Sequence, residues 1–268
     1  MIVSTQSGQI VLDRTDDWLT ICLNRPDSRN ALTVEMIEEL HDTLTACRDE
    51  LSIRGITLRG KGGFFCAGGD IKGFRDVFQG KLQNEAEIAE ANRQAGELFE
   101  LIDRMPQVVV MLVEGAAIAG GLGMLCAADI VVVTRGTQFA LTETMLGIPP
   151  AQIAPFVVRR IGITAARSIM LTAARFDGER AKELGLANEV VEDAAGLDAA
   201  EQKIRRQVRQ CAPGANAVTK EILLATGELE SDAMRRFAST RFAACMLGDE
   251  GREGVAAFIE KRKPGWAE

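Results

Sequence analysis

The chain has 268 residues, 47% of them hydrophobic and 26% charged, and it carries a formal net charge of −7 at pH 7. This is the composition of a globular protein that is long enough to bury a sizeable core. A nucleic-acid-binding protein needs a basic surface to displace counterions. The acidic balance disfavours such a surface, so we expect no nucleic-acid partner.

Cysteine spacing and apolar patterning exclude further classes. The six cysteines form no Cys-x-x-Cys pair and His41 is the single histidine, so we expect reduced thiols in a reducing compartment and no metal site. The first residues show no signal-peptide or transit-peptide pattern. Glu114, Asp129 and several glycines interrupt the longest apolar stretches, which predicts no membrane-spanning helix and no membrane partner. The expected location is the cytoplasm.

Hydrophobic periodicity predicts alternating strands and helices in the first half of the chain. In chain order, the expected elements are strands at 9–14 and 17–23, a helix capped by Thr33, a strand at 53–58, a long helix at 83–104, a strand at 108–113, a short helix at 121–127 and a strand at 130–133. After Thr134 helical patterns continue to the end, apart from a short Val190–Val191 segment. We therefore predict an α/β fold with a core domain over 1–194 and a helical C-terminal extension over 195–268.

Two glycine-rich loops, at 66–72 and 114–123, each follow a predicted buried strand. Glycine lets a backbone N–H approach a ligand, and the start of a helix adds free N–H donors that favour an anion. Two such donors that point at one spot would form an oxyanion hole. A tight turn at Gly68–Gly69 and a close packing contact at Gly120–Gly121 would explain the same glycines.

A dinucleotide site is a weaker interpretation of the second loop. Gly121-Leu122-Gly123 after a strand matches the start of a Gly-x-Gly-x-x-Gly fingerprint. Cys126 stands at the third glycine position, and the next strand is expected to begin near Ile130. The intervening helix is then too short for that motif.

The order and spacing of several motifs resemble the enoyl-CoA hydratase/isomerase (crotonase) superfamily over about residues 9–263. The matching motifs are Asn24-Arg25-Pro26 with Asn30-Ala31-Leu32, Phe65-Cys66-Ala67-Gly68-Gly69-Asp70-Ile71, the 115–130 segment, Phe139-x-x-x-Glu143, Gly147-Ile148-Pro149, Ala181-x-x-Leu184-Gly185-Leu186-Ala187 and Phe258-Ile259-Glu260-Lys261-Arg262. The resemblance implies a crotonase-like spiral of strand–strand–helix turns with a helical C-terminal trimerisation region. It also implies a homotrimer or a dimer of trimers.

The resemblance further implies an acyl-CoA thioester substrate and no separate cofactor, because coenzyme A is part of that substrate. By motif position, Gly69 and Gly120 would supply the oxyanion hole. Phe258 and Lys261 match positions that contact the adenine and phosphates of coenzyme A, often from a neighbouring subunit. The other residues expected along the acyl-CoA site are Ala67, Gly68, Asp70, Ile71 and Gly123.

Hydratases of this family usually carry two glutamates around one water. The second maps onto Glu143, whereas Gly123 stands where the first is expected. A single carboxylate could make both proton transfers of hydration, or could shuttle a proton between two carbons as in a Δ3-Δ2 isomerase. Capping of a helix start would also explain Glu143, and loss of catalysis at Gly123 would leave a pseudoenzyme that only binds acyl-CoA. We predict a hydratase and keep the isomerase and the pseudoenzyme as alternatives.

Two segments resemble a narrower group within the family. Residues 150–162 and 211–217 resemble isohexenylglutaconyl-CoA hydratases of acyclic terpene breakdown and, nearly as closely, methylglutaconyl-CoA hydratases. Gly123 is expected to leave room for a bulky branch at the β-carbon. We therefore expect a β-branched enoyl-CoA as the substrate.

Overall fold

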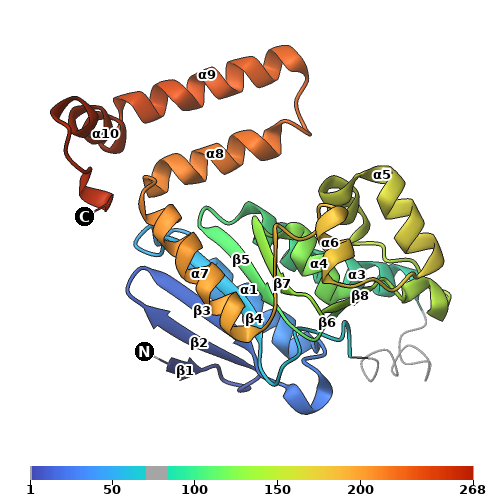
Figure 1. Cartoon of the computed structure of the whole chain (residues 1–268). Coiled ribbons are helices and arrows are strands. Elements are labelled where there is room, and N and C mark those ends of the chain that lie inside the picture. Colours follow the sequence, from blue (N-terminus) through green and yellow to red (C-terminus); the bar gives the residue numbers. More distant parts are fainter. Residues whose placement is uncertain (1, 71–83, 268) are drawn as a thin grey trace.

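The computed structural model describes residues 2–70 and 84–267, and its centre is a seven-stranded sheet (Figure 1). In their order across the sheet, the strands are β1 (Ile2–Ser4), β2 (Ile10–Thr15), β3 (Trp18–Leu23), β4 (Gly55–Gly60), β5 (Val108–Val113), β7 (Ile130–Thr134) and β9 (Glu189–Val191). The first three strands pair antiparallel, and each pair from β3 to β9 is parallel. The predicted α/β fold is confirmed.

The central strands are buried on both faces. Successive residues of a strand point to opposite sides, so Val110 and Leu112 of β5 pack with helix α7 (Ala194–Arg209). Val109 and Met111 belong to the larger hydrophobic core on the opposite face. Burial on both faces explains why β5 is an unbroken apolar run in the sequence, as is usual in parallel sheets.

In the part of the chain that the structure describes, five helices pack around the larger core. They are α1 (Val34–Cys47), α3 (Glu85–Arg104), α4 (Gly120–Ala127), α5 (Ala154–Thr172) and α6 (Gly178–Glu183). Thr33 caps α1 as predicted, because its Oγ1 accepts a hydrogen bond of 3.1 Å from the N–H of Met36. The long helix predicted at 83–104 is α3, which begins at Glu85 after the N-cap residue Asn84.

Strand β1 and two further short strands were not predicted from the sequence. Strands β6 (Ala116–Ile118) and β8 (Gln138–Ala140) pair in parallel and form a separate two-stranded sheet. Each has three residues, so neither is long enough to show the alternation that marks a strand. Their pairing nevertheless matters, because it brings the second glycine-rich loop beside the segment that leads to Glu143.

Helix α7 belongs to the core, so the boundary predicted at residue 195 does not follow the packing. Its buried residues Leu197, Ala200 and Ile204 cover the sheet. The helices that project away from the sheet are α8 (Pro213–Ala225), α9 (Ser231–Leu247) and α10 (Asp249–Glu260), as Figure 1 shows. The extension therefore begins after α7, because the apolar stripe of α7 faces the sheet.

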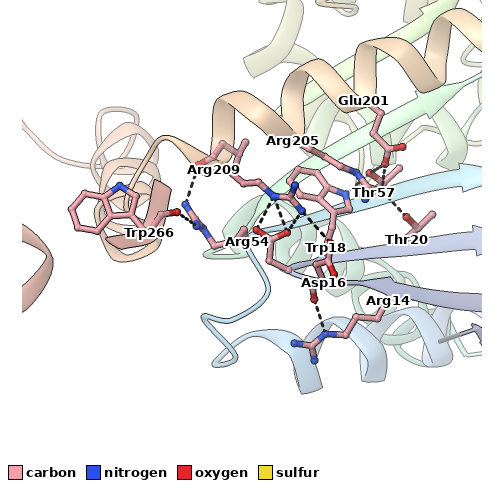
Figure 2. Close-up of polar contacts among 12 residues, drawn as sticks. Arg14, Asp16, Trp18, Thr20, Arg54, Thr57, Glu201, Arg205, Arg209 and Trp266 are labelled. Carbon is pink, nitrogen blue, oxygen red and sulfur yellow. Dashed lines mark hydrogen bonds and ion pairs between the residues drawn. The ribbon is translucent and has the colours of Figure 1, made fainter. Parts of the chain in front are cut away.

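A buried polar network joins α7 to the sheet (Figure 2). The indole N–H of Trp18 donates to Thr57 at 2.8 Å, and the hydroxyl of Thr57 donates to Glu201. Arg205 pairs with Glu201 at 2.8 Å, and its guanidinium lies 5.0 Å from the centroid of the Trp18 ring. Because Glu201 and Arg205 are almost fully buried, each depends on its partner for compensation of its charge.

Arg54 ties the C-terminal end of the chain to the same region (Figure 2). Its guanidinium donates to the carbonyl of Trp266 at 3.2 Å and to that of Val208 at 3.1 Å. It also donates to the carbonyl of Cys211, just before α8. The start of the projecting helices and the last described residues are therefore held by one side chain of the core.

Within residues 2–70 and 84–267, no helix is long and apolar enough to cross a bilayer. In the same two ranges, no group of three or more histidine, cysteine or acidic side chains is placed to hold a metal ion.

Candidate active site

Three parallel segments deliver the predicted catalytic groups to one edge of the small sheet. Ala117 of β6 pairs with Phe139 of β8, and Cys66 forms a bridge with Ala117 from the other side. Gly69 lies three residues after Cys66, Gly120 three residues after Ala117, and Glu143 four residues after Phe139. Because these segments run in the same direction, all three groups emerge at the same end.

The backbone N–H of Gly69 lies free of the chain's own hydrogen bonding in the described residues. Around it, the carbonyl of Gly68 accepts from Leu32 N–H and the N–H of Asp70 donates to the Leu32 carbonyl, both at 2.8 Å. Successive peptide groups of an extended segment point in opposite directions, so the N–H of Gly69 points away from Leu32. It is therefore available to an acceptor from outside the chain.

Within residues 2–70 and 84–267, the N–H of Gly120 is a second donor without an acceptor in the chain. Gly120 is the first residue of α4, and the first N–H groups of a helix have no acceptor within it. Ala119, the residue before it, has φ 50° and ψ −119° and donates to the Ala140 carbonyl at 2.9 Å. This conformation is rare for a residue with a side chain, and it sets the direction of the next N–H. A strained backbone at such a position is typical of functional sites.

The two loops are in close contact. A Cβ placed on Gly68, which has φ +89°, would lie 2.9 Å from the Cβ of Ala119 and 3.0 Å from the carbonyl oxygen of Ile118. Only glycine allows this approach together with this φ. The close approach places both free N–H groups, those of Gly69 and Gly120, on the wall of the same cavity.

Glu143 lines the same cavity. It is the first residue of the 3-10 helix η2 (Glu143–Leu146), which begins three residues after the end of β8. Phe139 of β8 is fully buried and stacks on Phe176 with 5.3 Å between the ring centroids. Its Oε2 is buried and has no hydrogen-bond partner in the described residues. Burial raises the pKa of the Glu143 carboxyl above its ordinary value. Such an environment is typical of a group that accepts and returns a proton.

The cavity has a volume of about 700 Å³. One face of α3 forms a wall of it through residues spaced one helical turn apart, among them Ile88, Asn92 and Phe99. Sequence reasoning missed this wall. The helical pattern at 83–104 was visible, but the side of the helix that faces a cavity depends on where the helix packs.

Gly123 does not line the cavity. A Cβ at this position would lie 2.9 Å from the Cβ of Ile153, closer still to its Cγ2, and 3.2 Å from Cε1 of Phe99. The expectation that Gly123 leaves room for a substrate branch is therefore wrong, because Ile153 fills that space. The place where the family resemblance predicted a second glutamate is occupied by an apolar side chain.

The first motif, Asn24–Leu32, holds the Gly69 loop in place through side-chain contacts. Asn30 is fully buried and its side-chain amide donates to the carbonyls of Lys61 and Phe64 at 3.0 and 2.6 Å. Arg25 pairs with Asp70 at 3.1 Å. These bonds hold the segment before Cys66 and the end of the Gly69 loop. They place Asp70 in an ion pair at the edge of the site.

The remaining predicted residues lie at different places. Ala67 lines the cavity together with Gly69, Gly120 and Glu143. Phe258 and Lys261 lie at the end of α10, where 85% of Phe258 is exposed, and neither lines the cavity. Ile71 lies outside the described residues.

The geometry defines an enzyme site: two free N–H groups can polarise a carbonyl oxygen, and the half-buried carboxylate of Glu143 on the same cavity can move a proton. The family model for enoyl-CoA hydratase/isomerase matches residues 15–268. The chain belongs to the enoyl-CoA hydratase/isomerase family and is an enzyme of that family.

Individual relatives agree with this assignment. A putative enoyl-CoA hydratase from Thermus thermophilus is 31% identical over 91% of this chain and 95% of its own length. The mevalonyl-coenzyme A hydratase sidH from Aspergillus fumigatus is 30% identical over 98% of this chain and 96% of its own. The solved structure of Pseudomonas aeruginosa AtuE is 46% identical, covers 97% of this chain and 100% of its own, and superposes with a TM-score of 0.93.

Proposed function

We propose that this enzyme is an enoyl-CoA hydratase in which Glu143 is the single acid–base group. The observation that carries the proposal is the buried, unpaired Oε2 of Glu143 on the same cavity as the free N–H groups of Gly69 and Gly120. The names of the relatives support hydration as the reaction.

The chemistry follows from these three groups. The N–H groups of Gly69 and Gly120 bind the thioester oxygen and stabilise the negative charge that develops on it. The Glu143 carboxylate accepts a proton from water while the water oxygen bonds to the β-carbon and the double-bond electrons move toward the thioester. Glu143 then returns the proton to the α-carbon. No cofactor is needed, because the reaction is not a redox step and coenzyme A arrives with the substrate.

The raised pKa of Glu143 suits this role, since a base with a higher pKa accepts a proton from water more readily. An isomerase that moves a double bond between the 3- and 2-positions is the second candidate. Ile153 stands where a second acid would hold the water, and a lone carboxylate in apolar surroundings can shuttle a proton between two carbons.

A β-branched acyl group, of the isohexenylglutaconyl or methylglutaconyl kind, is the proposed substrate class. The segment whose sequence resembles those hydratases includes Pro150, Ala151, Gln152 and Ile153, and all four line the cavity. The side chains that would contact a branched acyl group therefore lie in the segment that distinguishes this chain within its family.

Assembly as a homotrimer or dimer of trimers is proposed from the projecting helices. They expose large apolar side chains, among them Phe242, Leu247, Phe258 and Ile259, each at least 65% exposed. Contiguous exposed apolar groups are typical of an interface, and a closed symmetric oligomer would cover them. In such an oligomer, the resemblance to the family implies that Phe258 and Lys261 contact the coenzyme A of a neighbouring subunit, while Ala67 and Asp70 lie along it within the subunit.

A panel of enoyl-CoA thioesters, linear and β-branched, tests the function. Loss of the conjugated thioester absorbance with a gain of one water by mass is the expected result. A changed spectrum at unchanged mass would replace hydration by isomerisation. No change with any thioester, together with measurable binding, would contradict both and support a pseudoenzyme.

A matched pair of variants tests the oxyanion hole. Gly120→Pro removes the donor N–H at the first helical position, where proline is tolerated, and should lower kcat by about 10²–10³. Gly120→Ala keeps the donor, and its Cβ would meet Leu32 Cδ1 at an ordinary 3.4 Å, so it should lose far less. Circular dichroism must show both variants folded. Equal activity of the two would contradict the role of this N–H.

A further inference from the structure

The wall of the cavity carries a further polar spot, apart from Glu85, Thr142 and Glu143. Gln152 Nε2 donates to Asn92 Oδ1 at 2.8 Å, and both residues line the cavity. Asn92 lies on α3, and Gln152 lies in the segment between η2 and α5. Around them the lining includes Ala89, Ala95, Ile148 and Pro149. A pair of amides stands in largely apolar surroundings.

The backbone beside the pair is shaped to hold it. Gly96 is buried in the interior of α3, one turn after Asn92. A Cβ there would lie 2.9 Å from Cδ of Gln152 and 3.1 Å from its Cγ, and closer still to Oε1. Glycine inside a helix costs about 1 kcal/mol relative to alanine. At this position it lets the amide of Gln152 lie directly against the helix.

The amides have unused hydrogen-bonding capacity. Together, one asparagine and one glutamine offer four N–H donors, and the bond between them uses one. In the described part of the chain, no other protein group bonds to either side chain. Asn92 is exposed and Gln152 is half-buried, so water can accept from the three remaining N–H groups in the free enzyme, and an oxygen atom of a ligand in the cavity can replace that water.

We infer that Asn92 and Gln152 form a subsite for an oxygen-bearing branch of the acyl group, a carboxylate or a carbonyl. The inference rests on the proposed function, since it concerns the acyl group of the same site. Ile153, the neighbour of Gln152, packs over Gly123 of α4, so the subsite lies beside the wall that covers the position of the missing second glutamate. A purely hydrocarbon branch displaces water from these donors without replacing its hydrogen bonds.

The test compares three β-branched enoyl-CoA thioesters of similar size. One branch ends in a carboxylate, one in the methyl ester of that carboxylate, and one in an isopropyl group. The wild type should favour the oxygen-bearing branches over the hydrocarbon by about tenfold in kcat/KM, as one net hydrogen bond of about 1.4 kcal/mol provides. Preference for the carboxylate alone identifies an anionic branch, and equal preference for the ester identifies a carbonyl acceptor.

Gln152→Leu removes the amide at nearly constant volume and should reduce that preference about tenfold. Asn92→Leu should do the same. Gln94→Leu is the matched control, because Gln94 lies on the same helix outside the cavity and bonds to Glu90. The control should keep the wild-type preference. Equal loss for all three thioesters in Gln152→Leu, or no loss of preference, would overturn the subsite.

Binding separates this inference from the proposed function. Dissociation constants of the corresponding saturated thioesters, measured by calorimetry, need no turnover. Preference for the oxygen-bearing branch in binding, lost in Gln152→Leu, supports the subsite even if no thioester is hydrated. Hydration of all three thioesters without any preference in rate or binding supports the function and overturns the subsite.

Discussion

Gly123→Ala tests whether Ile153 replaces the second acid in the active-site wall. An alanine Cβ would lie 2.9 Å from Ile153 Cβ and 3.2 Å from Phe99 Cε1. Carbon atoms normally approach to about 3.5–4.0 Å. Ile153 and Phe99 are buried at 4% and 7% exposure, so neither can move into solvent to relieve the contact.

The sign of the stability change distinguishes a filled space from an open one. At an open helical position, Gly→Ala stabilises by about 0.5–1 kcal/mol because it lowers the entropy of the unfolded chain. Overpacking a buried site costs about 1–3 kcal/mol. The two effects leave a net loss of roughly 1 kcal/mol in the free energy of unfolding.

Urea denaturation followed by circular dichroism measures the change in the free energy of unfolding, and a double-mutant cycle with Ile153→Ala tests its cause. Ile153→Ala removes the nearest contact, that with Cγ2, but keeps the Cβ at 2.9 Å, so in that background Gly123→Ala should destabilise less, with a coupling of roughly 1–2 kcal/mol between the sites. Gly123→Glu should gain no hydratase activity, since its side chain cannot enter. A stabilised Gly123→Ala in the otherwise unchanged protein would refute the packing argument.

The other predictions concern the carboxylate and the buried network. Glu143→Gln should lower turnover by about 10²–10⁴ while thioester binding persists; retention of more than about a tenth of the activity, a loss below about 1.4 kcal/mol, would exclude Glu143 as the base. In the wild type, kcat/KM should rise with pH through a pKa above the ordinary 4.5 of a glutamate, and this limb should vanish in the variant. The pKa of Glu143 is higher in the folded than in the unfolded protein. Protonated Glu143 therefore costs no stability at a pH below its unfolded pKa, and the folded protein loses stability as the pH rises through its folded pKa. Glu143→Gln should therefore be more stable than the wild type at about pH 7 and equal to it at about pH 4, as thermal melts would show. Glu201→Ala leaves Arg205 buried and uncompensated and should cost about 3–5 kcal/mol; a loss under about 1 kcal/mol in urea denaturation would mean that the network contributes little.

Local patterns in the sequence determine much of this protein. Val108–Val113 is an apolar run between Pro106 and a glycine-rich loop, and the structure has a strand with the same bounds. The helical spacing after Thr33, the two glycine-rich loops and the position of Glu143 after Phe139 are likewise properties of short segments. Their order along the chain was enough to predict the α/β fold and the family.

Tertiary packing alone decides the rest. Ile153 lies thirty residues after Gly123 in the sequence, so no local pattern relates the two, and only the fold shows that one side chain fills the space left by the other. The apolar stripe of α7 predicts a helix, but only its contact with the sheet assigns it to the core. Asn92 and Gln152 are sixty residues apart in the sequence, and only the packing of their segments brings them within hydrogen-bond distance. Secondary structure follows from the spacing of near neighbours, whereas the shape and chemistry of a cavity follow from which distant segments pack against one another.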